Sequence, residues 1–211
     1  MFEKDLKQGK LAEQEVLQLI SKTNKSSVNC TSRITDIDLD KKGIDCFIST
    51  SSDEVYSADV KTYTFGINVA ESKGWFRDGQ VLCLEIVGGP ESACFSNSLK
   101  KTDLVLYYWS GMYPSRIGLD QFENYLKKGY TSHVLFEYSF AHFLVQHNDF
   151  ISKEFTGAKV LRNNFSSGSF LNITVQSLLN IRRSWIRAGG ASNAFVDQFN
   201  EEHFDLYGLK Y

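Results

Sequence analysis

Two segments determine how this chain folds: Gly43-Ile44-Asp45-Cys46-Phe47-Ile48 and Glu54-Val55-Tyr56-Ser57-Ala58-Asp59-Val60-Lys61. Apolar and polar residues alternate in both, which is the pattern of a β-strand with one buried face. In the first segment, Asp45 points away from its apolar neighbours. In the second, Asp59 and Lys61 share the face opposite Ala58 and Val60. We therefore predict a hairpin that gathers charged side chains on one side.

A helix is predicted upstream of the hairpin, over residues 4–22, with an apolar stripe of leucine, valine and isoleucine side chains. When the residues are laid out at about 100° each, Glu13 falls in the middle of that stripe. A carboxylate on a core-facing stripe is costly unless a cation or a hydrogen-bond donor meets it. Two alternatives follow for Glu13: an arginine or lysine partner, or a role as ligand of a metal ion.

Three aspartates, Asp36-x-Asp38-x-Asp40, lie between this helix and the hairpin. They do not match a calcium-binding loop, because the glycine stands at Gly43 and because Phe47 occupies the position of the bidentate glutamate. We expect residues 32–39 to form a strand. The turn into the hairpin is expected at Lys41-Lys42-Gly43.

The rest of the chain mixes apolar runs with polar connections. Residues 98–103 are a polar connection whose lysines, Lys100 and Lys101, are expected to be solvated. Residues 131–150 are compatible with helix and with strand, and residues 162–169 are expected to be a loop. Apolar runs and helix stop signals predict strands at 81–87 and 104–109 and helices at 119–128 and 171–187.

Length and composition narrow the class of protein. A chain of 211 residues fits one compact domain. Its apolar runs are too short for a membrane span and its amino terminus is charged, so we expect no membrane association and a cytoplasmic protein. The four cysteines lack the spacing of a zinc or iron–sulfur site and are expected to be free thiols. The net charge of −2 is not the basic excess of a non-specific nucleic-acid binder, although a local patch can serve that purpose.

The hairpin and the helix together supply the candidate site. Glu13, Asp45 and Asp59 form an oxygen-rich set suited to Mg²⁺ or Mn²⁺, which are hard ions that also bind substrate phosphates. Lys61 can orient a nucleophile or stabilise developing negative charge. Glu85 interrupts the strand at 81–87, and it is either a further acidic site residue or part of a structural ion pair.

At these positions the chain resembles a known family. The order Gly9-x-x-x-Glu13, Gly43-Ile44-Asp45 and Asp59-Val60-Lys61 resembles the motifs of the PD-(D/E)XK nuclease superfamily, which has the restriction-endonuclease-like fold. The spacing in the first motif is similar to that of archaeal Holliday-junction resolvases. Ile44 stands where proline is commonest and Asp59 where glutamate is commonest. The resemblance covers residues 4–110.

The resemblance implies roles for single residues. Asp45, Asp59 and Glu13 would be ligands of Mg²⁺ or Mn²⁺, together with the main-chain carbonyl of Val60. Lys61 would be the catalytic lysine, and all four charged side chains would belong to the catalytic set.

The resemblance also implies the fold and the partner. We expect an α/β core, a mixed central sheet flanked by helices, over residues 1–112. Residues 113–211 are expected to form a mainly helical extension packed on this core as one unit. DNA would be the partner, and a homodimer is compatible with cutting two strands.

Five basic residues are candidates for contact with DNA. Two lie in the aromatic segment 62–79, which is either a substrate-contacting loop or a loop packed by its own aromatic side chains. Three lie on the helix at 171–187, where a solvated helix surface is the alternative. The candidates are Lys73, Arg77, Arg182, Arg183 and Arg187.

The sequence thus predicts a Mg²⁺-dependent deoxyribonuclease, with endonuclease favoured over exonuclease. Restriction, repair, junction resolution and phage DNA processing are not distinguished. One alternative is a catalytically inactive member of the same fold that acts as a DNA-binding, assembly or inhibitor protein. Another is an unrelated α/β protein in which the carboxylates and Lys61 form a structural ion-pair network.

Overall fold

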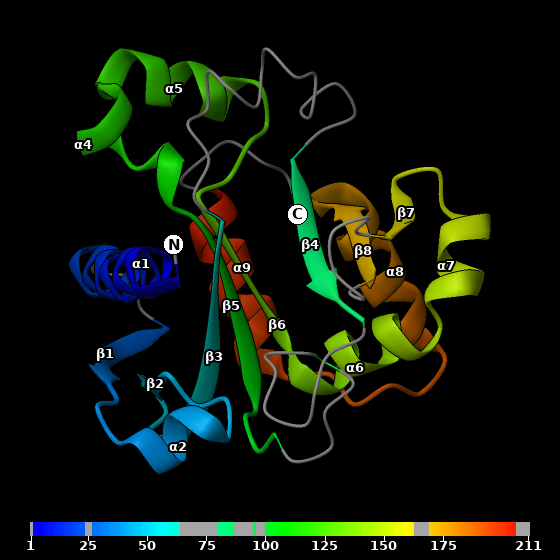
Figure 1. Ribbon diagram of the computed structural model, residues 1–211, viewed down its shortest axis with the longest axis horizontal. Helices are drawn as coiled ribbons and strands as arrows, with labels where there is room; N and C mark the ends of the chain where they lie inside the picture. Colours follow the sequence, from blue (N-terminus) through cyan, green and yellow to red (C-terminus); the bar gives the residue numbers. More distant parts are fainter. Residues whose placement is uncertain are drawn as a thin grey trace.

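The predicted hairpin lies within a mixed five-stranded sheet in the computed structural model, which describes residues 2–23, 27–63, 80–86, 95, 100–162 and 169–205 (Figure 1). Its strands are antiparallel except for β3 and β5, which run parallel. In the hairpin, Cys46 pairs with Ala58, and Asp59 pairs with Val105 on the far side of β3. The order across the sheet is β1 (Val28–Arg33), β2 (Cys46–Thr50), β3 (Val55–Tyr63), β5 (Leu104–Trp109) and β6 (His133–Glu137).

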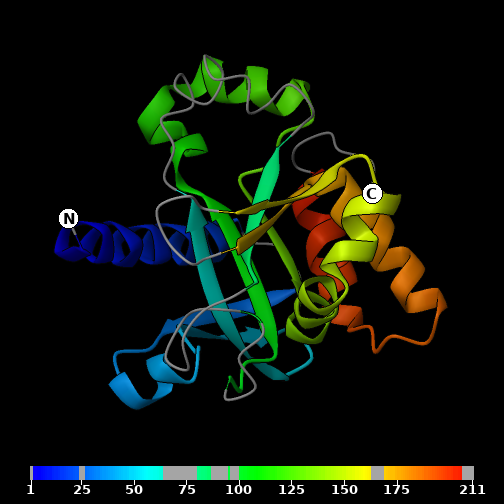
Figure 2. The same cartoon turned by 45° about the vertical axis from the view of Figure 1, so that its right-hand side comes forward.

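A second sheet lies over one face of the first (Figures 1 and 2). It is antiparallel and has three strands in the order β4 (Val81–Glu85), β8 (Ser169–Thr174) and β7 (Ala158–Arg162). Strand β4 follows β3 in the sequence but leaves the main sheet to pair with β8. The side chains of Leu82, Leu84, Leu171 and Ile173 pack against those of β5 and β6.

Helices cover both faces of the main sheet. On one face, α1 (Phe2–Lys22) and α9 (Ala194–Asp205) enclose an apolar core with the hairpin. On the other face, the second sheet encloses a larger core with α6 (Tyr138–Gln146), α7 (Asn148–Glu154) and α8 (Val175–Arg187). The shorter elements are α2 (Ile37–Lys41), η1 (Ser110–Met112), α4 (Pro114–Ile117) and α5 (Leu119–Lys127).

The position of β5 between the two cores explains its composition. All six of its residues are buried. Leu104, Leu106 and Tyr108 face the core beneath α1, whereas the alternate residues face the core beneath the second sheet. A strand covered on both faces gives a continuous apolar run instead of an alternating one.

The coarse prediction, an α/β fold with a mixed sheet and helices, is confirmed. The predicted helix at 4–22, the hairpin, the strand at 104–109 and the helix at 119–128 are all present. Gly129 has a φ of 84° directly after the last turn of α5, as the glycine stop signal requires. The ambiguous segment 131–150 divides into strand β6, helix α6 and the start of helix α7.

Two predictions of secondary structure were wrong. Residues 37–41 form helix α2 because the carboxylate of Asp36 accepts hydrogen bonds from the backbone N–H groups of Asp38 (2.8 Å) and Leu39 (3.3 Å), which caps the helix. The helix predicted from residue 171 begins at Val175, because Ser169–Thr174 is strand β8 and the hydroxyl of Thr174 caps α8. The loop predicted at 162–169 lies almost wholly outside the described residues.

Two further expectations concern the membrane and the cysteines. Within the described part of the chain, no helix combines the length and the apolar composition needed to cross a bilayer. The thiols of Cys30, Cys46 and Cys83 are free, and Cys94 lies outside the described residues.

Candidate active site

The site begins with the alternation of side chains along the hairpin. Ala58 and Val60 pack into the core beneath α1. Asp59 and Lys61 therefore project to the other face of the sheet, where the second sheet lies. Asp45 immediately precedes β2 and points to that same face, because Cys46 packs beneath α1. The structure thus brings three of the predicted site residues together.

Asp45 and Asp59 form the acidic centre of the site. The carboxylate of Asp45 accepts a hydrogen bond from the backbone N–H of Val60 at 2.7 Å, and the charge of Asp59 acts on it. Burial and the charge of Asp59 raise the pKa of Asp45 to about 8. The pair therefore holds a proton at neutral pH when no cation lies between its carboxylates.

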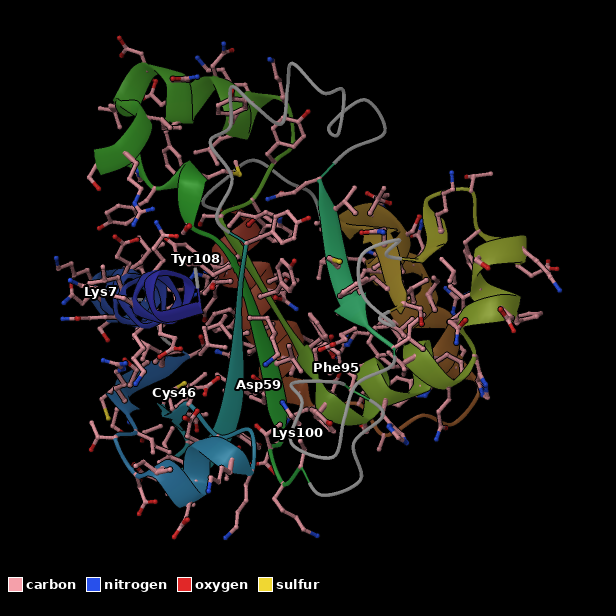
Figure 3. All side chains as sticks on the ribbon, viewed as in Figure 1. Lys7, Cys46, Asp59, Phe95, Lys100 and Tyr108 are labelled. Atoms are coloured by element: carbon pink, nitrogen blue, oxygen red, sulfur yellow. The ribbon has the colours of Figure 1, made fainter. Side chains whose placement is uncertain are left out.

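Two lysines neutralise Asp59, whose side chain is only 1% exposed. The ammonium of Lys61 contacts one carboxylate oxygen, and the ammonium of Lys100 lies 2.7 Å from the other (Figure 3). Burial alone would raise the pKa of Asp59, but Lys61 and Lys100 outweigh it and the pKa is lowered. For Lys61 each effect has the opposite sign. Burial lowers its pKa, but the charges of Asp59 and Asp45 raise it by more, so the pKa is raised overall. Asp59 is therefore ionised and Lys61 is charged.

Lys100 is the site residue that the sequence analysis missed. Its side chain is 4% exposed, although it was expected to be solvated. It passes over Gly43, where an added Cβ would lie 2.9 Å from the Lys100 side chain. Gly43 also has a φ of 74°, so both its conformation and the passage of Lys100 require a glycine there.

An aromatic ring shields one side of the site. The ammonium of Lys61 lies 6.0 Å from the centre of the Phe95 ring, within the range of a cation–π contact. Phe95 is itself buried in the core beneath the second sheet. Lys61 therefore has a carboxylate on one side and an apolar ring on another.

Glu13 does not join the two aspartates. It lies on α1, which covers the opposite face of the main sheet, and its carboxylate is 3.3 Å from the guanidinium of Arg33 on β1. Burial raises the pKa of Glu13, and Arg33 partly offsets this effect. Of the two alternatives for Glu13, the structure shows the arginine partner.

The remaining acidic groups fit a divalent cation in part. In the described ranges, no group of three or more His, Cys, Asp or Glu side chains is arranged to hold one ion. The raised pKa of Asp45 nevertheless shows that negative charge is concentrated here, which a cation could offset, and a carboxylate has more acceptor positions than Asp59 uses for its lysines. The N–H of Val60 points to Asp45, and in an extended strand the carbonyl of the same residue points to the same side.

The predicted DNA-contacting residues have different positions. Lys73 and Arg77 lie outside the described residues. Arg182 is 2% exposed, and its guanidinium binds Glu137 at 2.6 and 2.8 Å and Asp197 at 2.6 Å. This corrects the expectation for Arg182, because a buried and paired guanidinium is not presented to DNA. Arg183 is half-buried and Arg187 is exposed near the end of α8.

Glu85 lies at the end of β4 in the second sheet, opposite Phe170, and its carbonyl accepts the N–H of Phe95 at 3.4 Å. It is half-buried and has interactions with its surroundings.

Comparisons with protein-family models, curated proteins and solved structures find no match to this chain. Inferences about function therefore rest on the geometry of the site.

Proposed function

We propose that this chain is a metal-dependent nuclease that hydrolyses phosphodiester bonds in DNA. The observation that carries the proposal is the placement of Asp45 and Asp59 on one face of the hairpin, where the Val60 N–H binds Asp45 and two lysines bind Asp59. Buried carboxylates are costly to bring together, and such pairs are concentrated at functional sites. We also propose the restriction-endonuclease-like fold for the core, because the order of these residues in the sequence resembles that of the motifs in proteins with this fold.

The carboxylates of Asp45 and Asp59 would hold Mg²⁺ or Mn²⁺, with the carbonyl of Val60 as a further ligand. When bound, the ion would lower the pKa of a coordinated water and offset the charge of the scissile phosphate. Glu13 is not required for this set, because Arg33 already neutralises it.

The two lysines contribute the positive charge that phosphate chemistry needs. Hydrolysis joins a water oxygen to phosphorus as the bond to the leaving oxygen breaks, and negative charge grows on the phosphate oxygens. Lys61, held between Asp59 and the Phe95 ring, would orient the attacking water or bind a phosphate oxygen. Lys100, fixed from the opposite side of Asp59, would stabilise the charge on the leaving group.

The test is cleavage of DNA by the purified protein with Mg²⁺ or Mn²⁺, compared with the variant Asp45→Asn. Asparagine is isosteric and its amide oxygen can keep the bond to the Val60 N–H, so the variant should fold. We expect cleavage to fall by a factor on the order of 10² or more, because a neutral amide is a poor ligand for Mg²⁺. Asp38→Asn, at an exposed position on α2, is the matched control and should cleave normally.

Calorimetry with Mn²⁺ separates catalysis from a purely structural site. We expect one binding site in the wild-type protein and none in Asp45→Asn. Full cleavage by Asp45→Asn, or by the wild type in excess EDTA, contradicts the proposal. Absence of both binding and cleavage would leave a non-catalytic protein with an ion-pair network at this position.

A further inference from the structure

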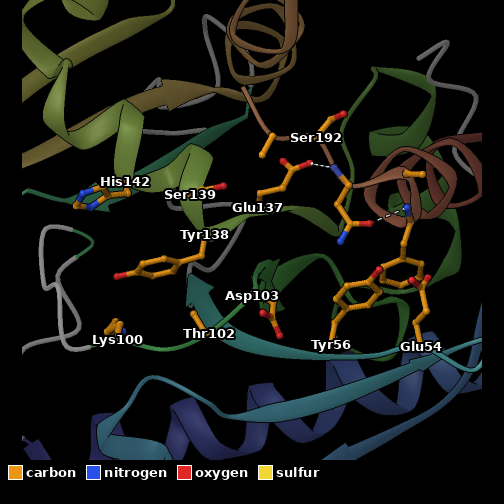
Figure 4. Close-up of a pocket in the computed structure, with 14 residues that line it drawn as sticks. Glu54, Tyr56, Lys100, Thr102, Asp103, Glu137, Tyr138, Ser139, His142 and Ser192 are labelled. Carbon is orange, nitrogen blue, oxygen red and sulfur yellow. Dashed lines mark hydrogen bonds between the residues drawn. The ribbon is translucent and has the colours of Figure 1, made fainter. Parts of the chain in front are cut away.

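A pocket of about 780 Å³ adjoins the candidate active site (Figure 4). Lys100 belongs to both, because its side chain lines the pocket while its ammonium binds Asp59. The remaining wall comes from the start of β3 and β5, the end of β6, the first turn of α6 and the residues around the start of α9. Its volume lies within the range of small-molecule sites.

Aromatic rings stand on two sides of this pocket. The rings of Tyr56 and Phe195 stack on each other, with centroids 5.4 Å apart and planes 5° apart. Tyr138 also lines the pocket, with Asp103 between it and Tyr56, and its ring extends toward the side of Lys100 and His142 (Figure 4). Aromatic rings of this kind are the side chains on which proteins stack an unpaired nucleobase.

The polar groups of the pocket include three carboxylates beside hydroxyl, amide and imidazole groups. Glu54, Asp103 and Glu137 contribute carboxylates. The hydrogen bonds that Asp103 accepts from the N–H and hydroxyl of Ser57 both go to Oδ2. Glu137 is already paired with a guanidinium and accepts the N–H of Asn193 at 2.9 Å. A phosphate would be repelled by this wall, whereas an exocyclic amino group would be bound by it.

The charge of the pocket lining changes from negative to positive at Lys100. The pocket is acidic on the side of Asp103 and Glu54, and Lys100 carries a positive charge toward the aspartate pair. A nucleotide has a neutral base and an anionic phosphate about one sugar apart. This polarity matches a base in the pocket and a phosphate at Lys100.

We propose that the pocket binds a single nucleobase that carries an exocyclic amino group and lies outside the base-paired stack, with its phosphate at Lys100. The inference rests on the proposed function, because it places the nucleotide next to the bond to be cut. Cytosine, adenine and guanine carry such an amino group, whereas thymine does not. The substrate at this position is therefore an unpaired or extruded nucleotide, and the pocket prefers cytosine to thymine.

The pocket is held in shape by buried contacts before any ligand enters. Arg182 fixes Glu137 from beneath, and Glu137 in turn fixes the backbone of Asn193. The side chain of Asn193 accepts the N–H of Phe195 at 2.9 Å, which caps the start of α9. Preorganised walls reduce the ordering cost of binding.

The test is equilibrium binding of mononucleotides to the wild-type protein in EDTA, followed by calorimetry or NMR titration. The probes are dCMP, dTMP and deoxyribose 5-phosphate, which lacks a base. We expect dCMP to bind on the order of tenfold more tightly than the baseless sugar phosphate, because stacking and the amino group are lost in the latter. Equal affinity for dCMP and deoxyribose 5-phosphate would overturn the inference, and so would a preference for dTMP.

Variants of Tyr138 assign the binding to this pocket. Tyr138→Phe keeps the ring and should bind dCMP as the wild type does, whereas Tyr138→Leu should lose about tenfold in affinity. Tyr113→Leu, before α4 and outside the pocket, is the matched control and should bind normally. Circular dichroism establishes that each variant is folded. Normal dCMP affinity in folded Tyr138→Leu contradicts the inference.

Failure of the pocket and failure of the nuclease give different results. If dCMP binds through Tyr138 but DNA is not cleaved with any metal, the proposed function is wrong and the pocket stands. If DNA is cleaved while dCMP and deoxyribose 5-phosphate bind equally, the nuclease stands and the pocket inference is wrong.

Discussion

The ammonium of Lys100 lies 2.7 Å from the carboxylate of Asp59, opposite the contact that Lys61 makes with the same carboxylate. Asp59 is thus the shared partner of two lysines from different parts of the chain. We expect Lys100→Met to lower the rate of DNA cleavage by a factor on the order of 10², the effect of removing one preorganised charge from a transition state. Single-turnover kinetics measure the rate.

Lys101→Met is the matched control for that substitution. Lys101 is adjacent in sequence but exposed, so its replacement should leave the cleavage rate within about twofold of the wild type. Equal rates for the Lys100 and Lys101 variants would show that Lys100 has no part in the reaction.

Substitution of Gly43 tests the path of the Lys100 side chain. Gly43 and Gly118 both have a positive φ, 74° and 85°, so alanine is strained at either position by about 1–3 kcal/mol. Only at Gly43 does an added Cβ meet Lys100; at Gly118 it meets nothing within 4 Å. We expect Gly43→Ala to reduce cleavage as well as stability, whereas Gly118→Ala reduces stability alone. Urea denaturation and cleavage assays check the two effects, and normal cleavage by Gly43→Ala contradicts this account.

The raised pKa of Asp45 predicts how stability changes with pH in the metal-free protein. Burial and Asp59 raise this pKa to about 8, whereas an aspartate in an unfolded chain titrates near about 3.9. Between these two pH values the folded protein binds more protons than the unfolded one. The free energy that protonation of Asp45 adds to folding is therefore lost as pH rises toward 8. In EDTA, the free energy of unfolding of the wild type should fall relative to Asp45→Asn from about pH 5 to about pH 8.5.

Urea denaturation of both proteins at several pH values measures that difference. The comparison with Asp45→Asn removes the contributions of groups that both proteins share. A difference that does not depend on pH would mean that Asp45 titrates normally.

The buried guanidinium of Arg182 predicts a large effect on stability. Its removal leaves the buried carboxylate of Glu137 without its cation, and such losses cost about 3–5 kcal/mol. We expect Arg182→Met to lower the free energy of unfolding by this amount. Arg187→Met, at an exposed position near the end of the same helix, should change it by less than about 0.5 kcal/mol. Similar stabilities of the two variants would contradict the structural role of Arg182.

The sequence predicted those features that depend on local alternation. The period of two in the hairpin placed Asp59 and Lys61 on one face, and that arrangement depends on no distant residue. Asp45 followed from the same pattern, because its neighbour Cys46 faces the core. The long helix α1 also followed from its apolar stripe.

The features that were missed depend on partners far apart in sequence. A polar connection gave no sign that Lys100 turns inward, because its position depends on Asp59 and on the absence of a side chain at Gly43. The angular position of Glu13 indicated that its carboxylate has a partner, but not whether that partner is a cationic side chain or a metal ion. In the structure the partner is Arg33 on β1. The sequence did not distinguish the arginines of α8 from one another. In the structure, Arg182 is the one that pairs with Glu137 and Asp197.

The pairing of β4 with β8 has a consequence for how the protein is made. Leu84 pairs with Leu171, so the central ladder of the second sheet joins an early strand to one from the last part of the chain. During translation, β4 is synthesised long before its partner. Its apolar side chains cannot pack against β8 until the chain has been extended beyond Thr174. The β4–β8 ladder can therefore form only after most of the chain has been synthesised.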